Sequence, residues 1–231
     1  QNIHLTLNGQ SENIIVIDVG AGTVDVSIME ISRTMEGLNS KLRSVKRIGQ
    51  QGGNLIDESI AKKQFVNEAA YDVLSSKVKE ELLSLAEKLK INIARYINTD
   101  KSVNFSLPPN STSDEKINIA ATAEIRRNGL NEVSLSFSEF NAIMLNYWEE
   151  ILETIELAID DAEIDITEIN KVILTGGGGR NPYMKNMVAL HFNRSELIIP
   201  DNIQEHVAKG TALHSFVLNS YGKNIVTPVL G

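Results

Sequence analysis

Cysteine is absent from this sequence of 231 residues, which excludes disulfides and thiolate metal sites. The fold must therefore be held by its hydrophobic core, and a chain of this length buries roughly 70% of its unfolded surface without covalent staples. Apolar runs are short as well, and none approaches the ~20 residues that a membrane-spanning helix needs. We expect a cytoplasmic protein without membrane contact.

Basic residues are also in the minority, because 22 Lys and Arg face 30 Asp and Glu and give a net charge of −8. No dense run of Lys or Arg occurs, and nucleic acids attract such runs. We therefore expect no nucleic-acid partner, although a nucleotide needs only a local anion site. The few histidines, His4, His191, His206 and His214, lack the spacing of metal ligands.

The sequence begins with strand patterns. Residues 13–20 form a short apolar run that ends in glycine, which predicts a buried strand. Residues 23–32 alternate and are rich in β-branched side chains, so a second strand follows a tight glycine-rich turn. Residues 41–48 are predicted as a third strand.

The middle of the chain is predicted to be helical and then mixed. Helical spacing covers residues 54–71, and residues 75–97 predict an amphipathic helix. Its apolar face consists of Val78, Leu82, Leu85 and Leu89. This spacing leaves Glu87 and Lys90 on the opposite face. Short strands are predicted over 103–107, 117–125 and 132–137, with a loop over 108–115.

In the second half, a capping box of Ser136 and Glu139 predicts the start of a long helix that runs to about Ala162. Its predicted core residues are Met144, Trp148, Ile151, Ile155 and Ile159. The elements after it are a buried strand over 171–175, a helix that begins at Asn181-Pro182 and a last helix over 204–218.

The segment 18–25, DVGAGTVD, has the composition of a phosphate-binding turn. Glycine lets backbone N–H groups approach a phosphate without a Cβ in the way, and Thr23 adds a hydroxyl donor. Asp18 at the strand end can hold a hydrated magnesium ion, because hard cations favour carboxylates and water. The alternative interpretation is a glycine-rich hairpin with two surface acids.

Four glycines at 176–179 form a second candidate anion site, between a buried strand and a capped helix. Exposed amides at a helix start favour an anion. Four glycines also cost chain entropy that a featureless loop does not justify. The alternative is a flexible turn. A Walker loop is excluded, because no Gly-Lys-Ser/Thr follows.

Five blocks of this sequence, in order, resemble the C-terminal lobe of the nucleotide-binding domain in the seventy-kilodalton heat-shock chaperone (DnaK-like) family. The blocks are IIVIDVGAGTVDVSIMEI, RIGQQGGNLIDESI, KVILTGGGGRNPYMKNMV, NIQEHVAKGTALHSFVL and IVTPVLG. They resemble, in turn, that family's second phosphate motif, its Gly-Gly turn and helix, its adenosine motif, its closing helix and the segment after the domain. The similarity covers nearly the whole chain in register.

The resemblance implies an α/β fold: an actin-like ATPase (ribonuclease H-like) lobe with a mixed sheet and flanking helices. Residues 1–52 and 136–224 would be its core, 53–135 a smaller α+β insertion over the nucleotide cleft, and 225–231 the start of a linker or following domain. The implied function is an ATP-dependent chaperone that binds MgATP or ADP between two lobes. Implied partners are the nucleotide, the N-terminal lobe, a substrate-binding domain, co-chaperones and unfolded client polypeptides.

The resemblance also assigns roles to individual residues. Asp18 and Asp25 become the catalytic acids, with Asp18 holding magnesium or positioning water and Asp25 orienting the attacking water. Nucleotide contacts are assigned to Gly20, Gly22, Thr23, Gly52, Gly53, Glu87, Lys90, Gly177, Gly178 and Arg180. The first three of these contact the β- and γ-phosphates, and the next two flank the cleft. Glu87 and Lys90 hold the ribose and adenine, and the last three form the adenosine loop.

The sequence departs from the family pattern at four positions. Ala21 replaces a usual glycine and Gln204 a usual Asp, while Ile91 and Ala94 stand where Arg and Ser usually hold adenine. The interdomain linker is shorter and more polar than usual, and the family's first phosphate motif and catalytic lysine are missing. We therefore expect a fragment, opening on Gln1, and ATP hydrolysis by the intact protein rather than by this chain alone.

Two other functions fit the same residues. An actin-like or plasmid-partition filament protein shares the Asp-x-Gly-x-Thr-x-Asp hairpin, and pelleting with ATP distinguishes it. A regulatory pseudo-ATPase of the chaperone family keeps the fold and loses turnover. Ala21, Ile91 and Ala94 motivate that second interpretation.

Overall fold

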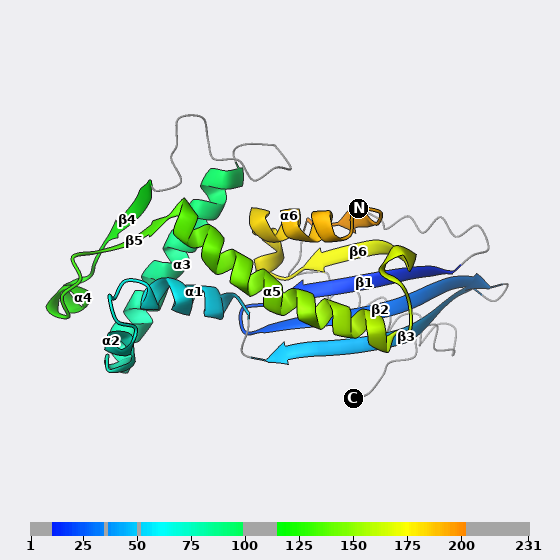
Figure 1. Ribbon diagram of the computed structural model, residues 1–231, viewed down its shortest axis with the longest axis horizontal. Coiled ribbons are helices and arrows are strands. Elements are labelled where there is room, and N and C mark those ends of the chain that lie inside the picture. The colour runs from blue at the N-terminus through cyan, green and yellow to red at the C-terminus, as the bar shows by residue number, and fades with distance from the viewer. Residues whose placement is uncertain (1–10, 35–36, 50–51, 99–114, 202–231) are drawn as a thin grey trace.

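A five-stranded mixed sheet forms the right-hand part of the molecule in Figure 1. Its strands are β1 (Glu12–Val19), β2 (Thr23–Thr34), β3 (Gly37–Gly49), β6 (Ile169–Thr175) and β7 (Glu196–Ile198), in the order β3-β2-β1-β6-β7. Strands β1 to β3 pair antiparallel, whereas β6 and β7 run parallel to β1. The computed structural model describes residues 11–34, 37–49, 52–98 and 115–201. The three strands expected at the beginning of the chain and the strand over 171–175 are confirmed.

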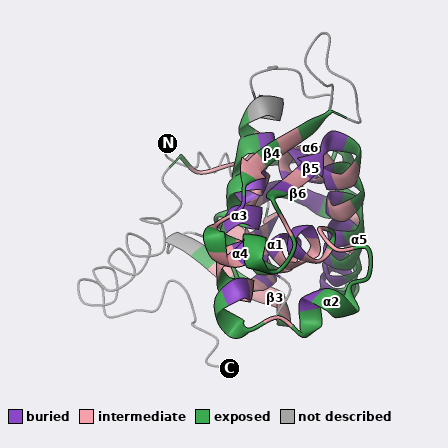
Figure 2. Cartoon of the chain, turned by 90° about the vertical axis from the view of Figure 1, so that its left-hand side faces the viewer, coloured by how far each residue is buried: buried purple, intermediate pink, exposed green. Residues whose placement is uncertain are grey.

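Two helices, α5 (Phe137–Asp161) and α6 (Pro182–His191), complete this part of the fold. Helix α5 packs on β2 and β3, and paired β-branched residues of β1 and β2 are buried on the sheet. These residues are Ile15 with Ile28, Ile17 with Val26, and Val19 with Val24. All five core residues predicted for α5 are buried. Figure 2 shows the same division along α5, whose exposed residues form its outer edge.

The predicted start of α5 is confirmed in detail. The Ser136 hydroxyl accepts a hydrogen bond from the Glu139 backbone N–H at 3.2 Å, and the Glu139 carboxylate accepts one from the Ser136 N–H at 2.9 Å. This capping box satisfies two donors that a helix start otherwise leaves unpaired. At α6 the Asn181 side chain accepts from the Tyr183 N–H at 2.9 Å, with Pro182 in the first turn, as expected.

The remaining elements lie to the left of the sheet in Figure 1. They are α1 (Gly53–Lys62), α2 (Ala69–Asp72), α3 (Ser76–Asn98), α4 (Ala123–Arg127) and a two-stranded sheet of β4 (Lys116–Ala120) and β5 (Glu132–Ser136). Short 3-10 turns cover Ile166–Glu168 and Gly178–Arg180. The apolar face predicted for α3 is buried as expected.

The helical prediction over residues 54–71 was too long. Helix α1 ends at Lys62, and turns follow before α2 begins at Ala69. The side chain of Gln64 donates to the Ser134 carbonyl at 2.9 Å and accepts from the Ser134 N–H at 2.9 Å. This contact with β5 ties the chain to a strand 70 residues away, which no local periodicity reports.

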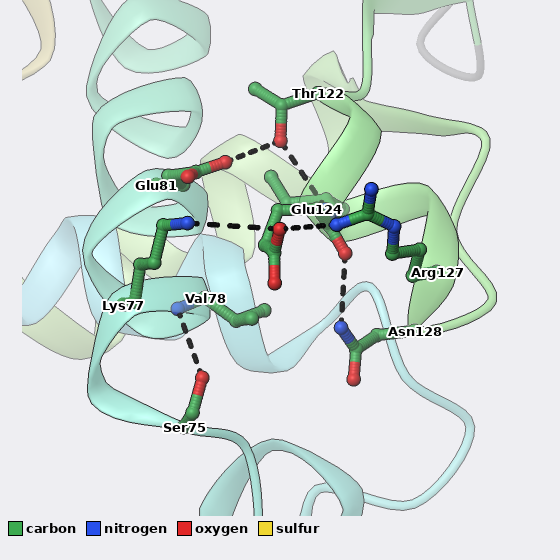
Figure 3. Close-up of polar contacts among 9 residues, drawn as sticks. Ser75, Lys77, Val78, Glu81, Thr122, Glu124, Arg127 and Asn128 are labelled. Atoms are coloured by element: carbon green, nitrogen blue, oxygen red, sulfur yellow. Dashed lines mark hydrogen bonds and ion pairs between the residues drawn. The ribbon is translucent and has the colours of Figure 1, made fainter.

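The strand predicted over residues 117–125 was half wrong. Strand β4 ends at Ala120, and Thr122 caps the short helix α4 by accepting from the Ile125 N–H at 3.3 Å. Figure 3 shows that the Thr122 hydroxyl also donates to the Glu81 carboxylate of α3. The Glu124 carboxylate forms ion pairs with Arg127 at 2.8 Å and with Lys77 at 3.7 Å. Threonine thus acts here as a helix cap rather than as a strand residue.

Several expectations lie outside the described residues. These are the strand over 103–107, nearly all of the loop over 108–115, the helix over 204–218, the position of Gln204 and the segment 225–231. Across the part of the chain that the structure describes, no helix is long and apolar enough to cross a membrane.

Candidate functional site

A cleft of about 530 Å³ lies where the β1–β2 turn, the starts of α1 and α6, and one side of α3 meet. Its lining includes seven residues predicted from the sequence as nucleotide contacts: Gly20, Gly53, Glu87, Lys90, Gly177, Gly178 and Arg180. These come from four separate stretches of the chain. The fold therefore brings the two glycine-rich loops, which follow the neighbouring strands β1 and β6, to the lining of one cavity.

The turn between β1 and β2 is joined to α1 by backbone hydrogen bonds. Gly20 donates to the Thr23 carbonyl at 2.9 Å, closing the turn. The first two N–H groups of α1, from Gly53 and Asn54, donate to the carbonyls of Gly20 and Ala21 at 3.0 and 2.8 Å. The start of α1 and the turn therefore form one rigid unit, and these α1 donors are already satisfied.

Gly52 shows why this junction needs glycine. A Cβ at Gly52 would overlap the backbone of Ala21 and of Gly22. A Cβ built at Gly22 or at Gly177 would instead lie in open space. Gly52 is the first glycine of the pair predicted to flank the cleft, and glycine is needed there because the two backbone segments approach so closely.

The loop after β6 packs against the end of β1. Gly176 has φ 80°, and a Cβ there would also overlap the Val19 carbonyl and the Asp18 carboxylate. A Cβ at Gly178 would overlap the Val19 side chain. The conformation and the packing both require glycine at position 176, so the run is a close-packed loop and not only a flexible turn.

Charged side chains form a row across the sheet, one strand apart. Asp18 on β1 pairs in register with Asp25 on β2, and Asp25 pairs with Arg47 on β3. On the other side, Asp18 stands in register with Thr175 of β6. Arg47 Nε donates to Asp25 Oδ1 at 2.5 Å, and the Thr23 hydroxyl donates to Asp25 Oδ2 at 3.1 Å. Both oxygens of Asp25 therefore have partners.

The donor chemistry at this row fits magnesium. Burial raises the pKa of the Asp18 carboxyl, and the negative charge of Asp25 raises it further. A divalent cation would relieve both effects, and carboxylate oxygens are the ligands that it prefers. Asp18 would hold the ion. Asp25, one strand away, would become available to it only after its bond to Arg47 is broken.

Lys90 lies against α1 and not on the solvated face of α3, which corrects the sequence prediction. Its ammonium donates to Asp57 Oδ2 at 2.7 Å and to the Gly53 carbonyl at 3.2 Å. Asp57 is only 7% exposed, and burial raises the pKa of its carboxyl while the hydrogen bond and charge of Lys90 oppose that rise. Glu87, one turn earlier on α3, is exposed and lines the cleft.

The far end of the cleft is lined by small and apolar side chains of α3. Ile91, 39% exposed, directly follows Lys90, and Ala94 stands one turn beyond Lys90 with Arg95 beside it. Arg180 faces them from the loop before α6 and donates to the Asp201 carbonyl at 3.1 Å. This end therefore offers apolar side chains and the exposed guanidinium groups of Arg95 and Arg180, which suit the faces of a heterocycle.

The remaining predicted residues lie beside the cleft, not in its lining. Asp18, Asp25, Gly22 and Thr23 belong to the turn and to the charged row, and Gly52 is the N-cap of α1, packed against the turn. The turn joins the two groups, because Gly20 lines the cleft and bonds to Thr23.

Sequence reasoning missed three residues of the site: Asp57, Arg47 and Tyr147. Asp57 carried a weak signal, since an acid next to Ile56 and four residues after Gly53 falls on the buried side of α1. Arg47 could have been found only by assuming the strand register. Tyr147 lines the cleft from α5, and its hydroxyl is buried without a hydrogen-bond partner in the part of the chain that is described.

No histidine of the described residues lines this cleft. Burial lowers the pKa of His191, whose ring packs edge-on against Phe192 at 4.8 Å between centroids. Within the described ranges, no group of three or more His, Asp or Glu side chains could hold a metal ion on its own. A cation at Asp18 would therefore need ligand oxygens from water or phosphate as well.

Comparison with known proteins gives a consistent result. The model of the Hsp70 protein family matches residues 4–229. The chaperone protein dnaK1 of Nostoc sp. is 28% identical over 96% of this chain and 30% of its own length. The chaperone protein DnaK of Thermosipho melanesiensis is 29% identical over 96% of this chain and 35% of its own length. The chain thus spans about a third of the length of the relatives it matches.

Proposed function

The chain belongs to the Hsp70 family, and from that premise we propose that it is the nucleotide-binding lobe of an ATP-dependent chaperone. In this proposal MgATP or MgADP binds in the described cleft, between this lobe and a second one. The mixed sheet with flanking helices is consistent with an actin-like ATPase fold. We extend the proposal to the core at 1–52 and 136–224, the insertion at 53–135 and a cytoplasmic setting.

One observation carries the proposal: two glycine-rich loops, more than 150 residues apart in the sequence, lie side by side and both line one cleft. Both loops are closely packed: Gly52 lies against the backbone of the first loop and Gly176 belongs to the second, and neither glycine has room for a Cβ. Such backbone turns present N–H groups to an anion. The apolar wall of α3 completes a site with a phosphate end and a base end.

In this proposal each group has a definite task. The turn around Gly20 and Gly22 binds the terminal phosphates, and Gly177 and Gly178 bind nearer the adenosine. Glu87 and Lys90 hold the ribose, and Arg180 stacks on the base. Magnesium bound at Asp18 would neutralise charge on the phosphate oxygens. Hydrolysis would need the other lobe. A substrate-binding domain would respond to hydrolysis, and co-chaperones and unfolded clients would be the partners.

Amide shifts test this assignment directly. In the chain labelled with ¹⁵N at glycine, MgADP should shift the resonances of Gly20, Gly53 and Gly177. Gly129 lies in the turn after α4 and is the internal control, because it is not part of the cleft lining. AMP should shift Gly177 but leave Gly20 nearly unchanged, since it lacks the β-phosphate. Shifts spread evenly over all glycines, or confined to Gly129, would refute the assignment.

A regulatory pseudo-ATPase is a second candidate that one observation favours. Arg47 and Thr23 occupy both oxygens of Asp25, the residue expected to orient the attacking water. Each oxygen keeps a second lone pair for a water, but the bond to Arg47 fixes the direction of the carboxylate and offsets its charge. Single-turnover hydrolysis by the intact protein, with and without Arg47→Ala, separates the candidates. A higher rate of ATP hydrolysis in Arg47→Ala than in wild type supports the regulatory pseudo-ATPase. Efficient hydrolysis by the wild-type protein refutes it.

A further inference from the structure

Lys90 is held in place by α1, although it belongs to α3. Its ammonium contacts the Gly53 carbonyl and the Asp57 carboxylate, which lie one helical turn apart on α1. The Lys90 side chain is 17% exposed and the Asp57 side chain 9%. Gly53 in turn donates to the Gly20 carbonyl, so the ammonium is connected to the turn at the phosphate end.

This position is electrostatically unfavourable for a lysine on its own. The start of a helix carries a partial positive charge, and Gly53 is the first residue of α1. An ammonium beside it is repelled unless an anion compensates. Asp57 supplies that anion at 2.7 Å, from the buried side of the same helix. Asp57 thus decides where the Lys90 ammonium can lie.

Counting donors shows what this arrangement leaves for a ligand. A lysine ammonium has three N–H donors. Asp57 and the Gly53 carbonyl take two of them, and no other acceptor among the described residues contacts the third. Since Lys90 lines the cleft, one donor with a fixed direction is available there. The carboxylate also cancels the charge of the ammonium, so the pair suits a neutral oxygen better than a phosphate.

We propose that Asp57 is a positioning residue that aims the remaining N–H of Lys90 at a ribose hydroxyl of the bound nucleotide. This inference rests on the proposed function, because it requires a nucleotide in the cleft. Asp57 acts in this proposal through Lys90: its Oδ2 holds the ammonium, while its second oxygen, Oδ1, is buried without a partner in the described part of the chain. It gives the site a preference for nucleotides whose sugar carries hydroxyl groups.

The test compares ADP with 2′,3′-dideoxy-ADP by calorimetry on the chain. Wild type should bind the dideoxy compound about tenfold more weakly, as expected for one lost hydrogen bond to a charged donor. Asp57→Asn should reduce that ratio to within about twofold, because the ammonium is no longer aimed. A purely structural role for Asp57 would weaken both ligands and keep the ratio.

Matched variants complete the experiment. Glu58→Gln makes the same acid-to-amide change one position along α1, where the carboxylate pairs with Lys62 at 2.9 Å and not with the cleft. It should keep the wild-type ratio. Lys90→Met should lose the preference, and adding Asp57→Asn to it should change the ratio no further, since the two residues act as one unit.

A measurement on the wild-type chain keeps the proposal testable even if Asp57→Asn does not fold. The Lys90 ¹⁵Nζ resonance should shift with ADP and not with dideoxy-ADP. Equal affinity of wild type for both ligands, or an unchanged ratio in Asp57→Asn, overturns the role of Asp57 while nucleotide binding stands. Failure of wild type to bind either ligand refutes the proposed function and the inference with it.

Discussion

At the end of the cleft that we propose binds phosphate, the contacts that shape the site join backbone atoms, whereas at the end proposed for the base they join side chains. Gly53 and Asn54 bond to the carbonyls of the turn, and a Cβ at Gly52 has no room. At the other end Ile91 and Ala94 present side chains that are free to vary, because Ile91 is 39% exposed. A backbone-built site resists substitution, while a side-chain wall can change without disturbing the fold.

The comparison also explains where the sequence departs from its family. Both changes at the base end, at Ile91 and Ala94, replace polar contacts with small or apolar ones on an accessible helix face. At the phosphate end the change is Ala21, whose side chain is exposed while its carbonyl keeps the bond to Asn54. The backbone path is therefore compatible with alanine at that position.

Gly176→Ala should give the largest effect and so tests the backbone-built end. Gly129→Ala is the matched control, because both glycines have positive φ, 80° and 92°, but only Gly176 is packed against other atoms. The control should lose about 1–2 kcal/mol of unfolding free energy from backbone strain. Gly176→Ala should lose a further ~1–3 kcal/mol from overlap with Val19 and Asp18. Equal losses in urea unfolding would show that packing at this loop is loose.

Arg180→Ala tests the base end. The guanidinium is exposed beside the cleft, and Ile91 provides no second cation to stack on the base. Removing it should weaken ATP binding by about 1–2 kcal/mol, the range of a desolvated cation–π contact. The loss should be the same with and without magnesium. Calorimetry with ATP, with and without magnesium, checks this. The affinity of the variant for tripolyphosphate, which has no base, should stay within about twofold of wild type.

Asp18→Asn tests the charged row between the two ends. The folded chain raises the pKa of Asp18, so the folded state binds the proton more tightly than the unfolded state does. Wild-type stability should therefore fall as pH rises from about 4 through the raised pKa, and the variant should lose that slope. At pH 7 the variant should gain about 0.2–1 kcal/mol, since like charges on paired strand positions repel. Urea unfolding from pH 4 to 7 measures both.

The same variant should reduce the magnesium dependence of ADP affinity. A variant that keeps the wild-type slope of stability with pH, or the full effect of magnesium, would contradict the assignment of Asp18.

Ile91→Arg should give a similarly small effect and tests whether the base end can be rebuilt by one side chain. The position lines the cleft and is partly exposed, so little core packing is lost. An added guanidinium opposite Arg180 should improve ATP binding by about 0.5–1 kcal/mol. Leu145→Arg, at a similarly exposed position on α5 outside the cleft lining, is the control and should change nothing. No gain at position 91 would mean that the base does not reach this wall.

Much of the fold followed from local signals. The capping box at Ser136 predicted the start of α5, and alternation of apolar residues predicted β1 and β2. The prediction over residues 54–71 failed because Gln64 docks on Ser134 far along the chain. At the site, the glycines of both loops were found from composition, since few other functions require so many in so short a run.

The sequence by itself determined strands β1, β2, β3 and β6, the starts of α5 and α6 and the two glycine-rich loops, because each depends on residues within a few positions of one another. Only the tertiary structure decided which charges meet. The spacing placed Lys90 opposite the apolar face of α3 without naming a partner, and it bonds to Asp57, 33 positions away, because α3 packs on α1. Arg47 meets Asp25 through strand register. An ion pair between distant segments depends on how whole elements pack, and periodicity within one element carries no information about that.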